Sequence, residues 1–362
     1  MDFPEKIYFG VILGEGQAEM RSSAFPKPGP EDVVVKMNVC NICTNDYQQF
    51  NGLRKKDVPM AAGHEASGTI IWKGERVSPK LEVGMQVANY VNGCNVCYNC
   101  RTGNEGWCDG KMHEEQPFSD GYYGRKPGER GFGNYMVIDQ RRLVHISNEI
   151  APACAAFLEP FSAALHCLRR GRVMPGEDVV IIGAGTMGMV NAQVAHAMGA
   201  RVIVTELDPN KIRRAKEMGI CDVVDAKKND PIQAIMQLTG GTGADVVVPC
   251  VSITPAFAQS AQMLKKRGGR VVIFGAGYPA PAFPAEFAEP NKVHYAEYEV
   301  IGAFGANGSD CVDAARMISN KLVHPEYMLE QKELIPLRDI QKAYELASTP
   351  GTYRVSVDLQ GI

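Results

Sequence analysis

The sequence predicts an α/β protein in which a doubly wound parallel sheet is inserted into an irregular, mostly β domain. The chain has 362 residues, and single hydrophobic cores stop growing at about 250–300 residues, so two domains are favoured. Residues 1–150 are rich in Gly, Pro, Asn and Cys, whereas strand-like and helix-like segments alternate later in the chain. We predict one domain from residues 1–154 and 307–362, and a second from residues 155–306.

The first domain is predicted from short β-like runs that are separated by turn residues. Residues 33–37 and 67–71 are two such runs, and short strands with frequent turns indicate an irregular β domain. After about Asn307 the chain is too short for another domain, so we expect it to return and complete this one.

The second domain is predicted from six apolar runs with helical patterns between them. Continuous apolar runs are typical of strands that are covered on both faces of a parallel sheet. The runs are residues 179–182, 202–204, 223–224, 246–248, 271–274 and 300–301. Asp208, Asp230 and Thr254 each precede a proline, which predicts a capping residue followed by the first residue of a helix.

A glycine-rich loop follows the first apolar run of the second domain. Its glycines are Gly183, Gly185 and Gly188, with Thr186 and Met187 between the last two. The first glycine permits a tight turn, the second lets a pyrophosphate approach the backbone, and the third lets helix and strand pack closely. The helix N-terminus then offers free N–H groups to phosphates, so we predict a dinucleotide site.

An acidic residue, Glu206, ends the second apolar run. A carboxylate there would accept hydrogen bonds from the adenosine ribose. A 2′-phosphate would face a like charge, with a repulsion of about 4 kcal/mol at 4 Å and an effective dielectric near 20. We therefore expect NAD rather than NADP. Asp208 is an alternative ribose ligand, and Lys211 either reaches the ribose or lies on the surface.

Four cysteines lie close together at Cys94, Cys97, Cys100 and Cys108. Four thiolates at this spacing can close a tetrahedral shell around one zinc and leave no position for a substrate. The surrounding loop is too polar to order itself, so metal binding should supply that order. We predict a structural zinc site.

A second set of chemically active residues is dispersed along the chain. It consists of Cys43, His64 with Glu65, and Glu159. Each is a weak signal alone, because a single Cys or His is more often structural. The basic residues 54–56 and His113 are interpreted as solvent-exposed loop residues, although residues 54–56 could face an anionic substrate.

These motifs together resemble the zinc-dependent medium-chain dehydrogenases, and more closely the sorbitol (polyol) dehydrogenase branch. The resemblance rests on residues 63–65, the four-cysteine segment, residues 158–162 and the glycine-rich loop, and it covers nearly the whole chain. It implies a GroES-like catalytic domain and a Rossmann coenzyme domain. It also implies that Cys43, His64 and Glu65 bind a catalytic zinc, with Glu159 holding its water or replacing a ligand.

The implied reaction transfers a hydride between the carbinol carbon of an alcohol and the nicotinamide ring of NAD. Two positions depart from the family pattern. Asn45 replaces the expected hydroxyl, and Gln48 replaces a relay histidine, and an amide cannot shuttle a proton as those groups do. We expect proton release through Glu159, or through Thr44 if the loop is shifted. Alternatively, Asn45 contacts the substrate and solvent carries the proton.

The predicted function is oxidation of a secondary alcohol, in particular a polyol or sugar-derived diol. A threonine-type amino-alcohol dehydrogenase and a non-catalytic sensor of NAD and zinc are the alternatives. The net charge of −3 argues against a nucleic-acid partner, and no apolar run is long enough for a membrane span. Clustered cysteines without a secretion signal indicate the cytoplasm. The resemblance implies a homodimer or homotetramer with residues 299–304 near the contact.

Overall fold

The computed structural model describes residues 3–54, 56–90, 93–110, 118–277, 280–282, 284–287 and 289–362. Lys55 and His113, for which solvent exposure was predicted, lie outside the described residues. The chain divides into two compact units, which are Met1–Glu159 with Asn307–Ile362, and Pro160–Ala306. The boundaries predicted from the sequence fall after residues 154 and 306. No described helix is long and apolar enough to cross a membrane.

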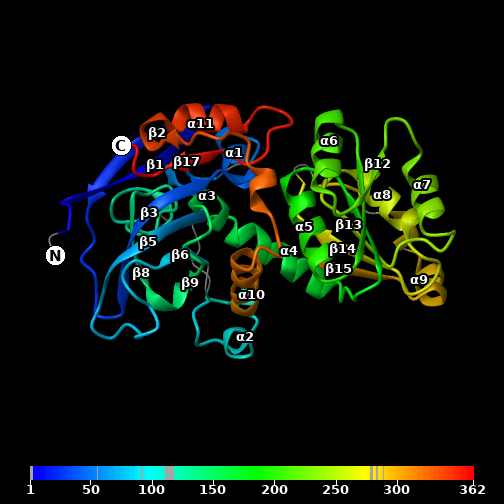
Figure 1. The fold of residues 1–362 in the computed structure, drawn as a ribbon, viewed down its shortest axis with the longest axis horizontal. Helices are drawn as coiled ribbons and strands as arrows, with labels where there is room; N and C mark the ends of the chain where they lie inside the picture. The colour runs from blue at the N-terminus through cyan, green and yellow to red at the C-terminus, as the bar shows by residue number, and fades with distance from the viewer. Residues whose placement is uncertain are drawn as a thin grey trace. The chain divides into compact units, whose positions relative to one another are not determined.

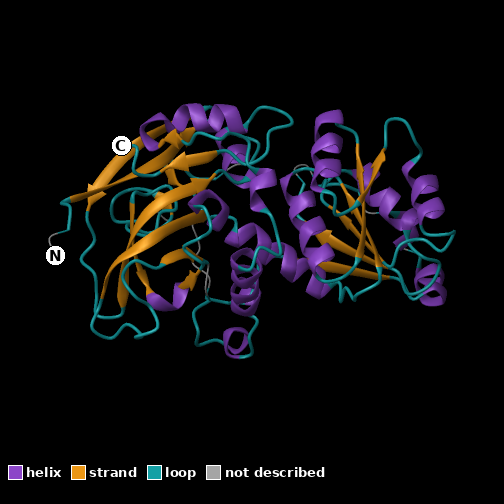
Figure 2. Cartoon of the chain, viewed as in Figure 1, coloured by secondary structure: helices purple, strands orange, loops and turns teal. Residues whose placement is uncertain are grey.

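The first unit, which contains both termini, is built on two sheets (Figures 1 and 2). The larger sheet has the order β16-β17-β3-β5-β6-β9, with β8 paired to β3. Its strands are β3 (Asp32–Asn41), β5 (Glu65–Lys73), β6 (Gln86–Asn89), β8 (Tyr135–Asp139), β9 (Leu143–His145), β16 (Ile335–Pro336) and β17 (Ser356–Asp358). The smaller sheet has the order β2-β1-β4-β7, with strands β1 (Lys6–Gly14), β2 (Gln17–Ala24), β4 (Met60–Ala61) and β7 (Tyr123–Gly124).

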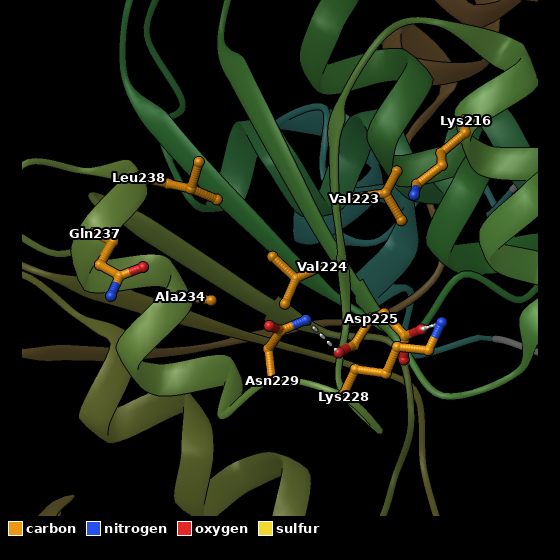
Figure 3. Close-up of a pocket in the computed structure, with 9 residues that line it drawn as sticks. All are labelled: Lys216, Val223, Val224, Asp225, Lys228, Asn229, Ala234, Gln237 and Leu238. Atoms are coloured by element: carbon orange, nitrogen blue, oxygen red, sulfur yellow. Dashed lines mark hydrogen bonds and ion pairs between the residues drawn. The ribbon is translucent and has the colours of Figure 1, made fainter.

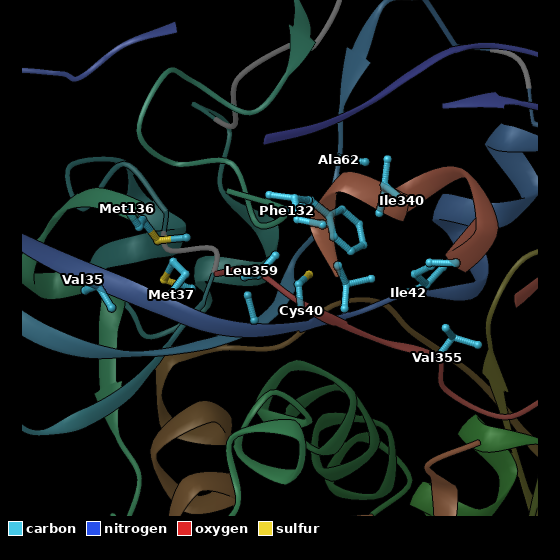
Figure 4. Close-up of a cluster of buried hydrophobic side chains, with 14 of the residues drawn as sticks. Val35, Met37, Cys40, Ile42, Ala62, Phe132, Met136, Ile340, Val355 and Leu359 are labelled. Atoms are coloured by element: carbon cyan, nitrogen blue, oxygen red, sulfur yellow. The ribbon is translucent and has the colours of Figure 1, made fainter. Parts of the chain in front are cut away.

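The core of the first unit lies along β3. Val33, Val35 and Met37 join one buried cluster of this unit, and Val34 between them is buried as well. Figure 4 shows this strand among side chains from distant parts of the chain, which include Phe132 and Ile340. The end of β3, where the chain approaches Cys43, is thus held by tertiary packing.

Short helices complete this unit. They are α1 (Thr44–Phe50), α2 (Tyr98–Arg101), α3 (Pro152–Ala155), α10 (Gly308–Ser319) and α11 (Ile340–Ala347), and α4 (Leu158–Arg170) begins at the boundary. The first turn of α10 contacts the four-cysteine segment. The N–H of Gly106 donates to Asn307 Oδ1 at 3.0 Å, and the N–H of Gly308 donates to Glu105 Oε2 at 3.2 Å.

The second unit is a six-stranded sheet in which every strand pair is parallel, as predicted. The strand order is β12-β11-β10-β13-β14-β15. The strands are β10 (Asp178–Ile182), β11 (Arg201–Glu206), β12 (Asp222–Asp225), β13 (Val246–Pro249), β14 (Arg270–Phe274) and β15 (Glu299–Ala303). The central strand β10 is buried from Val179 to Ile182, which explains its uninterrupted apolar run. Helices lie on both faces of the sheet (Figure 1).

These helices are α5 (Thr186–Ala197), α6 (Pro209–Met218), α7 (Pro231–Leu238), α8 (Thr254–Met263) and α9 (Pro290–Ala296). Asp208 and Asp230 cap α6 and α7 as predicted, each accepting two backbone N–H bonds. The prediction for Thr254 was wrong, because Ile253 is the capping position and Thr254 is the first helical residue. The Thr254 hydroxyl instead accepts a hydrogen bond from the N–H of Ala282 at 2.9 Å.

Candidate metal and cofactor sites

Three of the dispersed residues converge in the first unit. The ligand atoms of Cys43, His64 and Glu65 all lie within 4.8 Å of one another. Cys43 follows β3 and caps α1, whereas Glu65 begins β5. β3 and β5 are antiparallel neighbours, with Asn41 opposite Glu65. The last residues of β3 and the first residues of β5 therefore lie side by side.

His64 is held by a glycine before it and a carboxylate beside it. Gly63 has a φ of +94°, and an added Cβ would lie 2.7 Å from Phe132, so only glycine fits there. Asp46 Oδ1 lies 3.8 Å from His64 Nδ1, and Asp46 Oδ2 accepts the N–H of Cys43 at 3.2 Å. This separation is too long for a hydrogen bond, so Asp46 acts on the His64 ring through its nearby charge.

Arg354 is part of this site and was missed by the sequence analysis. Its Nε donates to Glu65 Oε2 at 2.8 Å and its Nη2 to Glu65 Oε1 at 2.7 Å. Arg354 is 3% exposed and Glu65 is 0% exposed, so the two buried charges neutralise each other through a bidentate pair. Arg354 Nη2 also lies 3.9 Å from Cys43 Sγ. The two residues are 289 positions apart, and no local motif announces the arginine.

The predicted proton-handling residues occupy different surroundings. The Thr44 hydroxyl accepts a hydrogen bond from Arg354 Nη1 at 3.3 Å, whereas Asn45 is exposed and Gln48 is half-buried. Glu159 does not belong to the set within 4.8 Å of one another among the described residues. Its charge nevertheless acts on that set, because it contributes to raising the pKa of both Cys43 and Glu65.

The donor set fits a zinc ion. Burial raises the pKa of the Cys43 thiol, and the Glu65 carboxylate raises it further, while Arg354 opposes both effects. Burial also raises the pKa of Glu65, against the lowering influence of Arg354 and His64. A dication would favour the ionised forms of both groups, and a sulfur, a nitrogen and an oxygen are the donors that zinc accepts. Three protein donors leave one tetrahedral position free.

The four predicted cysteines also converge. The Sγ atoms of Cys94, Cys97, Cys100 and Cys108 lie within 4.8 Å of one another, and those of Cys94 and Cys100 are 4.0 Å apart. A tetrahedron with Zn–S bonds of about 2.3 Å has edges of about 3.8 Å. A side chain on Gly93 would collide with Cys100 Sγ. The cluster therefore fits a zinc ion that is closed to other ligands.

The thiols of this cluster differ in acidity. Backbone N–H groups of Val96 and Cys97 lower the pKa of Cys94 to about 6. Burial raises the pKa of Cys100 to about 12. A bound cation is what allows all four to be thiolates at neutral pH.

The glycine-rich loop joins β10 to α5, which is the strand–loop–helix context that a phosphate-binding loop requires. Gly183 follows β10 with a φ of +98°. A side chain on Gly188 would collide with the carbonyl oxygen of Gly183, so helix and loop pack directly against each other. A Cβ on Gly185 would meet nothing within 4 Å. Packing does not require glycine there, which fits a position kept clear for a ligand. Thr186 and Met187 form the first turn of α5.

Glu206 is fixed beside this loop. Its Oε2 accepts the N–H of Ala184 at 2.7 Å, and its Oε1 accepts those of Leu207 at 2.6 Å and Asp208 at 2.9 Å. Asp208 also accepts two backbone N–H groups, both on Oδ1, as the cap of α6, so backbone bonding does not separate the two carboxylates as ribose ligands. Lys211 lies in the first turn of α6 and is half-buried.

A surface pocket of about 520 Å³ lies at the β12 edge of the second unit. Figure 3 shows it between β12 and α7, with Lys228 and Asn229 bonded to Asp225. None of the residues predicted to bind metal or cofactor lines it. The pocket is separate from the glycine-rich loop in sequence and carries no part of the predicted chemistry.

Two family models match the chain. Residues 29–148 match the alcohol dehydrogenase GroES-like domain, and residues 186–320 match zinc-binding dehydrogenase. A sorbitol dehydrogenase from Halalkalibacterium halodurans is 28% identical over 91% of this chain and 92% of that protein. An L-threonine 3-dehydrogenase from Mesorhizobium japonicum is 31% identical over 79% of this chain and 80% of that protein.

Solved structures share the fold. A zinc-binding dehydrogenase from Sinorhizobium meliloti, crystallised with NADP, superposes with a TM-score of 0.84 at 25% identity. The match covers 98% of this chain and all of that one.

Proposed function

This chain belongs to the zinc-binding dehydrogenases with an alcohol dehydrogenase GroES-like domain, and we propose that it oxidises a secondary alcohol with NAD. The observation that carries the proposal is the convergence of Cys43, His64 and Glu65 with one ligand position left free. A zinc ion bound there supplies Lewis-acid polarisation of a substrate oxygen. The four-cysteine cluster would hold a second, structural zinc.

The residues around the free position have separate tasks. Asp46 places a carboxylate charge on the Nδ1 side of the His64 ring. Arg354 holds both oxygens of Glu65, so Glu65 is fixed close to the other donors without carrying an uncompensated charge. A preorganised donor set of this kind needs little reorganisation when a substrate binds.

Glu159 is proposed to hold the proton that the alcohol gives up. Its carboxylate acts electrostatically on Cys43 and Glu65, and Asn45 is exposed and has no acidic proton. Thr44 is the second candidate, because a hydroxyl that accepts from Arg354 can still donate its own proton. Identical pH–rate profiles for the wild type and Glu159→Gln would rule out the Glu159 route.

The choice of NAD over NADP is proposed from Glu206. Three backbone N–H groups hold this carboxylate next to the glycine-rich loop, where a 2′-phosphate would meet a like charge. We expect kcat/KM for NAD to exceed that for NADP by about tenfold or more. The variant Glu206→Gln should narrow this ratio, and an unchanged ratio would assign the selectivity to another group.

The proposed substrate is a polyol or sugar-derived diol. The likeness to sorbitol dehydrogenase over 91% of the chain supports it. A screen of polyols, diols and threonine that follows NADH formation tests it, and the expected result is turnover of vicinal diols. Turnover of threonine alone would favour the second candidate, a threonine dehydrogenase, which the 31% identity to such enzymes supports. Binding of NADH without turnover of any alcohol would favour a sensor.

A homodimer or homotetramer in the cytoplasm is proposed as the state in which the protein works. The outer strand of the six-stranded sheet, β15, exposes Val300, and Phe304 follows it with 78% of its surface exposed. An uncovered edge with large apolar side chains is suited to pairing with a second copy. Light scattering should show Phe304→Lys as a smaller species than the wild type, whereas Val312→Lys on α10 should match the wild type.

A further inference from the structure

Three polar side chains are almost completely buried in the larger sheet, close to the strand ends that carry the metal donors. Asn41 and Ser67 are 0% exposed and Ser356 is 1% exposed. They come from β3, β5 and β17, which are adjacent in the sheet. Buried polar groups are costly unless their hydrogen bonds are made, so the partners of these three show what they hold.

The bonds of this trio lead out of the sheet and end on one helical turn. Ser356 Oγ donates to Asn41 Oδ1 at 2.7 Å, and Asn41 Nδ2 donates to the carbonyl of Ala153 at 3.2 Å. Ser67 Oγ donates to the carbonyl of Pro152 at 2.7 Å. Side chains of β3 and β5 therefore donate to the carbonyls of the first two residues of α3.

The bond from Asn41 replaces one that the helix lacks. In a continuing α-helix the N–H of Phe157 would donate to the carbonyl of Ala153. Here it donates to Cys154 at 3.1 Å instead, because the chain turns from α3 into α4. The Asn41 amide takes over the carbonyl of Ala153, which is left without that helical donor. The Asn41 amide thus ties the turn from α3 to α4 to the end of β3.

The hydrogen bond from Asn41 to Ala153 connects two segments that contribute residues to the candidate site. Asn41 lies two residues before Cys43 and opposite Glu65 in the strand pairing. Glu159 lies in the first turn of α4, directly after the tied turn. We propose that Asn41 is a positioning residue, which together with Ser67 holds the Glu159 carboxylate in place beside the metal donors. This inference rests on the proposed function in that it takes Glu159 to act in the reaction.

A double-mutant cycle between Asn41 and Glu159 tests the inference. Asn41→Ala should lower kcat about tenfold, as is typical for loss of a residue that orients a site group, and leave KM for NAD unchanged. In a Glu159→Gln background the same substitution should change kcat less than twofold, because the group that Asn41 positions is already disabled. A tenfold loss in both backgrounds would overturn the inference.

Two further variants separate positioning from general damage to the core. Ser67→Ala removes the parallel bond to Pro152 without touching Asn41, so it should show a smaller loss of kcat with the same dependence on Glu159. It carries the test if Asn41→Ala fails to fold. Asn38→Ala is the matched control, because Asn38 lies on the same strand and its amide donates to Thr69 Oγ1 at 3.3 Å. Its kcat should equal that of the wild type.

Release of the more labile zinc to a chelator gives a readout that needs no substrate. The Glu159 charge acts on Cys43 and Glu65, so its loss or displacement should weaken the attraction for a cation held there. Asn41→Ala and Glu159→Gln should therefore speed release by similar factors, the double variant should be no faster than either, and Asn38→Ala should match the wild type. Additive acceleration in the double variant would overturn the inference. Wild-type kcat and wild-type release in Glu159→Gln would instead contradict the role proposed for Glu159. If no alcohol is turned over, the zinc-release rates of the single and double variants alone test the positioning role of Asn41.

Discussion

The two metal clusters of this protein are built by opposite means. The four-cysteine cluster takes all its ligands from residues 94–108, a segment rich in polar residues. The cluster at Cys43 takes its donors from two strand ends and its charge balance from Arg354, near the other end of the chain. We expect metal binding to complete the order of the first cluster, whereas strand pairing and Arg354 hold the donors of the second. A metal site with four protein ligands can be specified by the spacing of those ligands along the chain. A site with a free ligand position needs other parts of the protein to hold its donors in place.

Removal of a donor from the open cluster should abolish activity and leave the fold intact. Cys43→Ala is expected to lower kcat/KM by about 1,000-fold or more, since loss of about 4 kcal/mol of Lewis-acid stabilisation corresponds to three factors of ten. Bound zinc should fall from two ions to one per chain, with a Tm close to that of the wild type. A large drop in Tm would show that metal also orders this cluster and would erase the contrast.

Removal of the buried cation should damage the fold around the open cluster. In the metal-free protein, Arg354→Gln leaves Glu65 buried without a cationic partner, which is expected to cost about 3–5 kcal/mol in the free energy of unfolding. Urea titration measures the change. Arg141→Gln is the matched control, because Arg141 pairs with Asp139 on the surface and such pairs contribute about 0–1 kcal/mol. Equal losses in the two variants would mean that the buried pair has no special role.

Removal of the carboxylate beside His64 should weaken the open cluster alone. Asp46→Asn keeps the shape of the side chain and removes the charge 3.8 Å from His64 Nδ1. Zinc affinity at the open cluster should fall by about 10- to 100-fold, as measured by competition with a chelator. The second zinc, in the four-cysteine cluster, serves as the internal control, and its affinity should not change.

Chelation of the wild type should separate the two clusters in time. The zinc of the open cluster, with three protein donors, should leave about tenfold faster than the zinc enclosed by four thiolates. Activity should be lost in the first phase, and the near-ultraviolet signal of Trp107, which precedes Cys108, should change only in the second. Simultaneous loss of both signals would show that the clusters are coupled.

The sequence was most informative where chemistry and spacing coincide within a short segment. The four cysteines and the glycine-rich loop could be predicted because each motif lies within one short segment of the sequence. The residues of each motif serve one shared ligand, so their spacing is itself informative. The six parallel strands could be predicted for a related reason, since strands buried on both faces, such as β10, must be apolar throughout.

The open cluster could be only partly predicted. Asp46 follows Cys43 by three residues on one helix, so its proximity to the metal donors was available from helical periodicity. Arg354 and Asn41 were not predictable in this way, because their partners lie far away in sequence and are brought together by strand pairing. Thr254 shows that the exact start of a helix is also hard to predict. Its hydroxyl does not cap α8 but accepts a hydrogen bond from the N–H of Ala282.

The pairing of Glu65 with Arg354 also has a consequence for the synthesis of the chain. Glu65 leaves the ribosome 289 residues before its cation, which at 5–20 residues per second is a delay of about 15–60 s. The whole inserted sheet is translated during that interval and can fold first. The site of Cys43 and His64 is therefore completed only after Arg354 has emerged, when the inserted sheet has already been translated.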